Sequence, residues 1–316
     1  MYNEEIKQRF IEDYSENDTT KVNTRRILNT LSGMEEKHGK DIYFLEFKVV
    51  AKEIFQHTKV LSYMTYYQYL MTIKMYKQWC MMNGIFDDTH YFPIKMISEV
   101  DIKKYYSEFM EANIFRSFVE LHKYIDEIFE LDLTSDNIKK QELLKLFILL
   151  LYHGIHEKDI FKLNIDNIIV KNNGVFIEYK NKLVQIQDNE TAKILIKRKK
   201  CSTYEIDRGR WTEYIDLHNI MVNFGSIDIE YNNKQTKGEI SRYIKAYNKK
   251  RDEIKKIQPF NIYVSGLIRQ IKEEENLNGE FLKINALYQR FLDNGYPEDI
   301  DNRSKKKIIK ETYKVW

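Results

Sequence analysis

The stretch LLYHGIHEKDIFKLNIDNIIVKNNGVFIEYKNKLVQIQ, residues 150–187, decides the fold. It opens with the end of an apolar helix, turns at Gly154 and continues into a second, short amphipathic helix. The pattern then changes to the alternation of strands, with turns at Asn173-Gly174 and near Lys180-Asn181. The stretch therefore predicts a helix–Gly–helix unit followed by a small three-stranded antiparallel sheet.

The part of the chain before this stretch predicts a compact helical module over residues 19–84. A first helix starts at the threonines near residue 19 and stops at Gly39, and another runs from a Ser62 cap to Asn83-Gly84. One face of the second helix is apolar, because its residues recur at spacings of three and four: Tyr66, Tyr69, Ile73, Tyr76 and Cys80. Lys74 and Lys77 are expected on its polar face.

The segment DDTHYFP, residues 87–93, has turn formers and no periodicity, so it predicts a domain boundary. Helical patterning resumes at Glu99, and after residue 190 only helices and irregular segments are expected. The fold class is mainly α (α+β). The predicted domains are a helical module over 1–90, a linker and helix over 91–112, and a larger domain over 113–316.

The composition excludes several classes of protein. Cys80 and Cys201 have neither metal-ligand nor redox spacing, which suits a reducing cytoplasm. The first residues, MYNEEIKQRF, are charged and predict no signal peptide, and the longest apolar run, LFILLLY, is too short to span a bilayer. His153 and His156 lack further ligands at metal-binding spacing. We therefore expect no metal and no cofactor, and a cytoplasmic location.

The net charge of +3 conceals a strong asymmetry along the chain. Residues 97–136 carry ten acids against four Lys or Arg, whereas residues 191–210 carry seven Lys or Arg against two acids. Residues 242–256 and 303–314 are also basic, with seven against two and six against one. One such run is usually a solvated face, but three in one half of the chain favour a polyanion partner such as DNA.

The order of these elements resembles the tyrosine recombinase (phage integrase) family over nearly the whole chain. Residues of the N-terminal module match the family pattern at Ser62, Thr65, Tyr69, Leu70, Lys74, Tyr76, Trp79, Asn83 and Gly84. The second module matches at Gly154, Asp159, Leu163 and Asp166. The resemblance implies a SAM-like core-binding domain followed by a recombinase-like catalytic domain, which together grip duplex DNA from two sides.

The resemblance also implies a chemistry for which this sequence lacks the residues. In the family a tyrosine attacks a DNA phosphate, and two arginines stabilise the negative transition state, as bidentate guanidinium groups do best. Here His156 holds the first arginine position and Tyr263 the second, while Phe260 and Tyr296 hold two histidine positions. The hairpin lysine alone is retained, as Lys180 or Lys182.

We therefore expect no enzyme, but a sequence-specific DNA-binding repressor that resembles the master repressors of SP-beta-like Bacillus prophages and controls phage lysogeny. The alternative is a divergent, active recombinase that uses Arg242 and Arg269 with Tyr313 as nucleophile. Expected partners are operator sites in duplex DNA and no membrane, with the chain a monomer or dimer; a regulatory protein or signalling peptide stays open. The basic residues expected to contact DNA are Arg25, Arg26, Lys74, Lys77, Lys180, Lys182, Arg198, Lys199, Lys200, Arg208, Arg210, Arg242, Lys249, Lys250 and Arg251.

Overall fold

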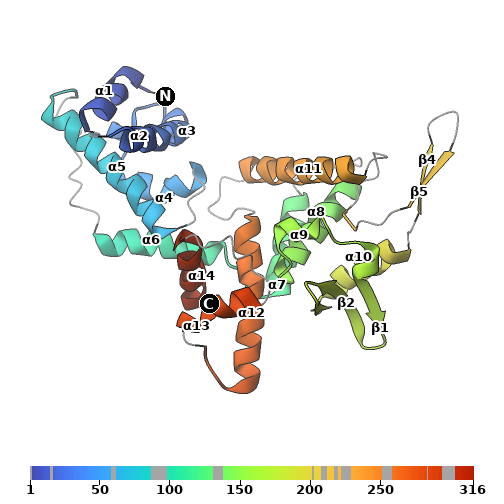
Figure 1. Cartoon of the computed structure of the whole chain (residues 1–316). Coiled ribbons are helices and arrows are strands. Elements are labelled where there is room, and N and C mark those ends of the chain that lie inside the picture. The colour runs from blue at the N-terminus through green and yellow to red at the C-terminus, as the bar shows by residue number, and fades with distance from the viewer. Residues whose placement is uncertain are drawn as a thin grey trace.

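The computed structural model describes most of the chain. The described residues are 2–14, 17–57, 62–86, 98–130, 138–200, 203–207, 212–216, 220–221, 229–250, 258–282, 284–293 and 303–316. The predicted boundary over residues 87–93 lies outside them, as does Tyr296. Figure 1 shows the N-terminal helices on one side of the molecule and the sheet on the other.

The N-terminal module is entirely helical, as its sequence predicts. Its elements are α1 (Glu4–Tyr14), α2 (Asp18–Thr30), α3 (Ser32–His38), the 3-10 helix η1 (Ile42–Phe44), α4 (Phe47–His57) and α5 (Tyr63–Met82). The expected caps are confirmed: the Ser62 side chain accepts from the Thr65 N–H, and Gly39 ends α3 with a left-handed φ of 63°. The helix expected up to Gly39 is divided at Leu31, where a bend places both Leu31 and Met34 in the core.

The first core also includes the helix expected from Glu99 in the predicted linker-and-helix segment 91–112. Helix α6 (Glu99–Ala112) starts with a capping box between Ser98 and Asp101 and buries one face, including Tyr106 and Phe109, against α4 and α5. The aromatic rings of Phe55 and Phe109 stack at 4.2 Å between centroids. Helix α6 is therefore part of the first core and not a separate connecting element.

The second core is built around two helices that cross at very close range. Helix α8 (Ile138–Tyr152) is apolar along most of its length, and α12 (Pro259–Asn278) packs against it. A Cβ atom at Gly266 of α12 would lie 2.0 Å from the backbone oxygen of Tyr152, so only glycine permits this approach. Helix α7 (Phe118–Glu130) adds Leu121 and Ile125 to the same core.

The three-stranded sheet follows α8 through the short helix α9 (Glu157–Ile160) and a 3-10 turn, η5 (Ile165–Asn167). Its strands β1 (Ile168–Lys171), β2 (Gly174–Tyr179) and β3 (Lys182–Ile186) are antiparallel in the order β1-β2-β3, as predicted. Lys171 pairs with Gly174, so the first turn is made by residues 172 and 173. Lys180 and Asn181 form the second turn, with left-handed φ values of 49° and 60°.

The expectation that strands end at residue 190 is wrong. Helix α10 (Asn189–Lys200) is followed by β4 (Thr203–Asp207) and β5 (Thr212–Asp216), which pair as an antiparallel ribbon. In the sequence, TYEID does alternate at the period of two that strands require, but its acids resemble those of a loop. The remaining helices are α11 (Ile229–Lys250), α13 (Ile284–Asp293) and α14 (Arg303–Val315).

Helix α14 connects the two cores. Its Ile308 is 1% exposed and belongs to the first core, whereas Ile309 and Tyr313 belong to the second. Helix α14 contacts α6, α12 and α13, and Figure 1 shows it below α6, between the two halves of the molecule. A residue from the C-terminal region therefore completes the N-terminal core.

Candidate nucleic-acid interface

His156 lies at the corner between α8 and α9, at the start of the short helix, as the sequence predicts. Gly154 makes the corner with a left-handed φ of 85°, and a Cβ there would lie 2.8 Å from Leu267. The backbone of His156 is extended, and its Nδ1 accepts the Lys158 N–H at 3.3 Å as the N-cap of α9. One ring nitrogen is thus used to hold the local structure.

The two positions that the resemblance assigns to arginines are brought together. The ring of His156 contacts the ring of Tyr263 edge to face, with 5.3 Å between centroids and 87° between planes. Tyr263 lies in the first turns of α12 and is 1% exposed. At these two positions the side chains are therefore two packed aromatic rings.

The hairpin lysine lies in a polar cluster beside this pair. The Tyr179 hydroxyl donates to Asp159 Oδ2 at 2.8 Å, and Lys180 Nζ lies 3.3 Å from the same oxygen. The backbone N–H of His156 points to the Tyr179 hydroxyl at 3.5 Å. Burial raises the pKa of Asp159, but the hydrogen bond from Tyr179 and the charge of Lys180 outweigh it, so that pKa lies below its ordinary value. Asp159 is therefore ionised and offsets the charge of Lys180.

Of the residues in this cluster, the sequence predicts a role for Lys180 but none for Asp159 or Tyr179. Asp159 matches the family pattern without a role, and Tyr179 is not singled out at all. The signal for Tyr179 is its position at the end of β2, where alternation places it on the buried side with Val175 and Ile177. Phe260 is half-buried and packs against both cores.

A cleft of about 520 Å³ adjoins the cluster, between the β2–β3 hairpin and α12. Lys180 and Lys182 line it from the hairpin, and Glu273 and Glu274 line it from α12. Its two walls therefore have opposite charge, which makes it a poor groove for a phosphate backbone.

Two residues of the alternative catalytic set, Arg269 and Tyr313, are held in other contacts. Arg269 is 5% exposed, pairs with Glu273 and lies over the rings of Phe118 and Tyr152 at 4.7 and 5.3 Å. The Tyr313 hydroxyl donates to the Glu275 carboxylate. Burial and that carboxylate raise the pKa of Tyr313, which opposes formation of a nucleophilic phenolate. Arg242 is exposed on α11.

Two of the basic residues expected on the surface are buried. Lys77 is 4% exposed, and its ammonium donates to the Leu45 carbonyl inside the first core. Burial lowers the pKa of Lys77 to about 8. Arg198 is 7% exposed, with Nη2 3.5 Å from Glu142 of α8. The expectation that these side chains lie exposed is wrong, because each is turned towards an acceptor distant in the sequence, the Leu45 carbonyl or Glu142, that the local pattern does not reveal.

The other predicted contacts remain available to different degrees. Arg25, Arg26, Lys180, Lys182, Lys200 and Arg242 are exposed, and Lys74 is half-buried. Lys199 is exposed but donates to the Ile168 carbonyl. Arg208, Arg210 and Arg251 lie outside the described residues, as do the side chains of Lys249 and Lys250.

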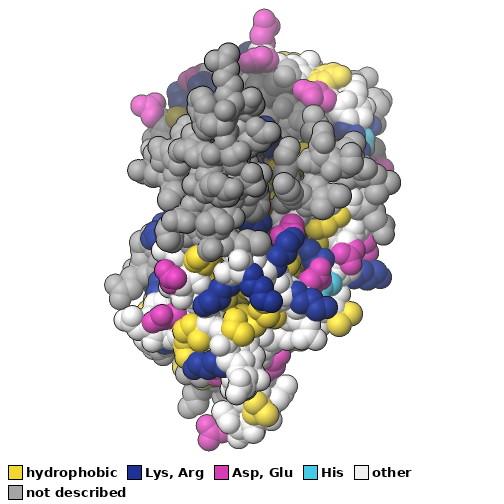
Figure 2. Space-filling view, turned by 90° about the vertical axis from the view of Figure 1, so that its right-hand side faces the viewer, with side chains coloured by type: hydrophobic (Ala, Val, Ile, Leu, Met, Phe, Trp, Pro, Cys, Tyr) yellow, Lys and Arg dark blue, Asp and Glu magenta, His cyan; other side chains and the backbone are white. Residues whose placement is uncertain are grey.

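The surface that carries the sheet and α10 mixes both signs of charge. Figure 2 looks onto that side of the molecule and shows Lys and Arg side chains interleaved with acids. At the end of α10, Lys197 pairs with Glu142 at 2.8 Å, whereas Lys200 is exposed. This part of the basic run 191–210 is thus less positively charged in the structure than its sequence indicates.

Comparison with protein families gives an independent indication of class. Residues 1–82 match the family model described as MrpR, N-terminal core-binding domain. No curated protein matches the chain. The N-terminal module thus resembles a core-binding domain, and the match fits a DNA-binding protein of recombinase type.

Two further observations concern the described residues alone. None of their helices combines the length and apolar character needed to cross a membrane. Within the same ranges, His, Cys, Asp and Glu side chains form no group of three that could hold a metal ion.

Proposed function

We propose that this protein is a sequence-specific DNA-binding repressor that uses a tyrosine recombinase scaffold without strand-cutting chemistry. The observation that carries the proposal is the contact between His156 and Tyr263, 5.3 Å apart at the two positions where the family has arginines. The match of residues 1–82 to a core-binding domain supports the choice of DNA as partner.

The physical argument concerns the charge of the transition state. A phosphate under attack gains negative charge, and fixed guanidinium donors stabilise it. The edge-to-face pair has no such charge, and Asp159 places a carboxylate 3.3 Å from the Lys180 ammonium. Losing one stabilising donor costs about 10²–10³ in rate, and here two donors are replaced.

The alternative of a divergent active recombinase draws no support from the contacts of its residues. The Arg269 guanidinium is packed between aromatic rings, and the Tyr313 hydroxyl is bound to a carboxylate. A lowered pKa would favour a nucleophilic phenolate, whereas burial and the Glu275 carboxylate raise the pKa of Tyr313.

The biological setting follows from the same resemblance. A repressor of this kind would act in the cytoplasm of a bacterial host, on operator sites of an SP-beta-like prophage, and maintain lysogeny. Its exposed cations, such as Lys200 and Arg242, would supply phosphate contacts, which give affinity and register.

The test separates binding from cleavage. A random duplex library is selected for binding to the full chain, and the preferred duplex is then prepared with nicks that trap covalent intermediates of recombinases. We expect specific, salt-sensitive binding and no protein–DNA adduct that survives denaturation. An adduct that disappears in Tyr313→Phe would establish the active recombinase instead. Absence of any preferred duplex would refute sequence-specific repression.

A further inference from the structure

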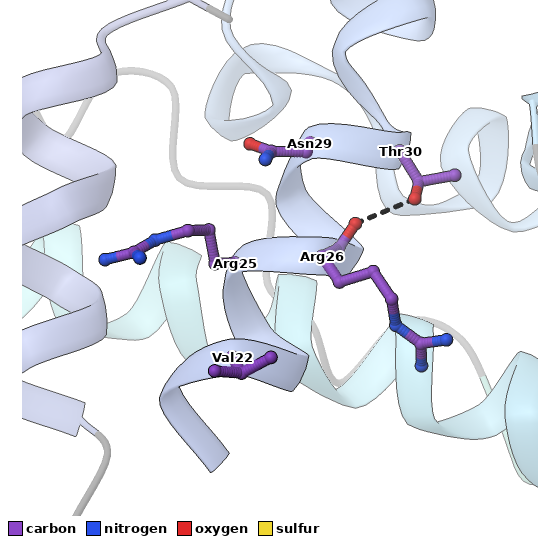
Figure 3. A pocket seen from close by; sticks show the side chains of 5 residues that line it. All are labelled: Val22, Arg25, Arg26, Asn29 and Thr30. Atoms are coloured by element: carbon purple, nitrogen blue, oxygen red, sulfur yellow. Dashed lines mark hydrogen bonds between the residues drawn. The ribbon is translucent and has the colours of Figure 1, made fainter. Parts of the chain in front are cut away.

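Helix α2 carries an exposed stripe that the repressor proposal does not use. Val22, Arg25, Arg26 and Asn29 line a shallow surface depression together with Thr30, and Figure 3 shows these side chains along one helix. Their spacing of three, one and three residues places them on one face. Val22 is 63% exposed and adds an aliphatic side chain to this face.

The other face of α2 is fixed in the first core. Thr24, Ile27 and Leu28 are buried, and the helix packs on α1 and α5. The Asn17 side chain caps its N-terminus by accepting the Thr20 N–H at 2.9 Å. The stripe is therefore presented by a rigid helix, which precise recognition requires.

The two arginines of the stripe differ in their contacts with neighbouring side chains. Arg25 Nη2 donates to the Gln8 side chain of α1 at 3.0 Å, and Lys21 pairs with Glu12 of the same helix. In the described parts of the chain, the Arg26 guanidinium and the Asn29 amide have no hydrogen-bond or ion-pair partner. The Thr30 hydroxyl donates to the backbone carbonyl of Arg26 at 2.7 Å, and the Arg26 guanidinium extends away from the helix (Figure 3).

We infer that α2 enters the DNA major groove and reads bases through Arg26, Asn29 and Val22. The inference rests on the proposed function, since it takes duplex DNA as the partner. The stripe carries two guanidinium groups and no carboxylate; Asp18, the acid of α2, lies a turn before Val22. This charge complements the duplex and favours DNA over a protein surface.

The chemistry of the three side chains assigns their bases. Arg pairs with guanine through two hydrogen bonds, Asn pairs likewise with adenine, and an aliphatic side chain contacts the thymine methyl group. The major groove is wide enough for one helix. The seven residue steps from Val22 to Asn29 span roughly 10.5 Å at 1.5 Å per step. At about 3.4 Å per base pair, the stripe covers about three consecutive pairs.

The experiment compares the sequences selected by matched variants of the full chain. Arg26→Lys keeps the charge and removes the planar fork, and Asn29→Ala removes the amide. Arg9→Lys, at an exposed arginine of α1, makes the same chemical change outside the stripe. Circular dichroism melting confirms that each variant is folded.

We expect Arg26→Lys to lose its preference for guanine at one position of the selected duplex. Asn29→Ala should lose adenine preference within three pairs of that position, and discrimination should fall roughly tenfold or more in each. Arg9→Lys should select the wild-type sequence. If both stripe variants select that sequence with full discrimination, α2 is not the reading helix, although repression stands. If the wild type selects no sequence, the proposed function fails and this inference with it.

Discussion

The Tyr106 hydroxyl donates to the Glu311 carboxylate at 2.8 Å, joining helices whose residues are 205 positions apart in the chain. Tyr106 belongs to the first core, and Glu311 lies on α14 three residues after the buried Ile308. Burial, and then the charge of Glu311, raise the pKa of Tyr106, so the phenol stays protonated and donates. The two halves are therefore connected by a buried apolar contact and a charge-assisted hydrogen bond.

Removing the apolar part of this connection should destabilise the whole chain. Ile308→Ala leaves a cavity in the first core, so the free energy of unfolding should fall by about 2–5 kcal/mol. Urea denaturation followed by fluorescence measures the change. Lys314→Ala, at an exposed position of the same helix, is the control and should alter stability by less than about 0.5 kcal/mol. Equal effects of the two variants would mean that α14 is not seated on the first core.

The close crossing of α8 and α12 predicts strong intolerance of a single methyl group. Gly266→Ala would place Cβ 2.0 Å from the Tyr152 oxygen, so the helices must separate, at a cost of at least about 3 kcal/mol. Gly238→Ala is the matched control, because among the described residues no atom beyond its own helix backbone lies within 4 Å of the added Cβ in α11. It should stabilise the chain by up to about 1 kcal/mol. Thermal melts measure both, and a Gly266→Ala protein as stable as wild type would contradict the close approach.

The buried His153 predicts a loss of stability in mild acid. Burial, and then the nearby charge of Arg269, lower the pKa of His153 from 6.5 to about 3. Below pH 6.5 the His153 side chain is therefore protonated in the unfolded chain, whereas in the folded chain it stays neutral until about pH 3. The contribution of His153 to the free energy of unfolding is fully present above pH 6.5 and is lost as the pH falls, by about 2 kcal/mol at pH 5.

The variant His153→Gln tests the source of this pH dependence. Urea denaturation of wild type and variant at pH 7 and pH 5 should show a smaller difference between the two pH values in His153→Gln. The absolute stability of the variant is not the readout, because the ring of His153 also packs against Phe118 at 4.8 Å. An unchanged difference would assign the acid sensitivity to other groups.

The basic end of α10 predicts different outcomes for two neighbouring positions. Lys200→Ala should leave stability unchanged and reduce the slope of log affinity against log salt by about 0.9, the value for one phosphate contact. Arg198→Ala should lower stability, because it removes a buried side chain paired with Glu142, and should leave the slope unchanged. Salt titrations of operator binding, with melts of both proteins, distinguish the roles. A reversed pattern would show that Arg198 turns outward on DNA.

The parts of the fold that the sequence predicts are those fixed by local pattern. Tyr66, Ile73 and Tyr76 of α5 are buried as their helical spacing requires, and the β2–β3 turn falls at Lys180-Asn181. Periodicity determines which face of an element is apolar, and turn chemistry determines where the chain reverses.

The parts that the sequence does not predict depend on distant neighbours. Lys77 reaches a carbonyl 32 residues earlier, and Ile308 fills a core made by the other end of the chain. The contact of His156 with Tyr263 could be expected only by analogy with a known family, since no local pattern pairs residues so far apart. In contrast, Asp159 and Tyr179 meet because α9 and the end of β2 converge at the Gly154 corner.

The position of Ile308 also sets an order of events during synthesis. A ribosome makes the N-terminal helices first, yet their core has an unfilled site until residue 308 has been translated and α14 has folded back onto α6. Until then, nascent chains expose apolar side chains to chaperones and proteases. A chain interrupted before α14 would retain this defect, so cellular quality control would remove truncated products before they could occupy DNA.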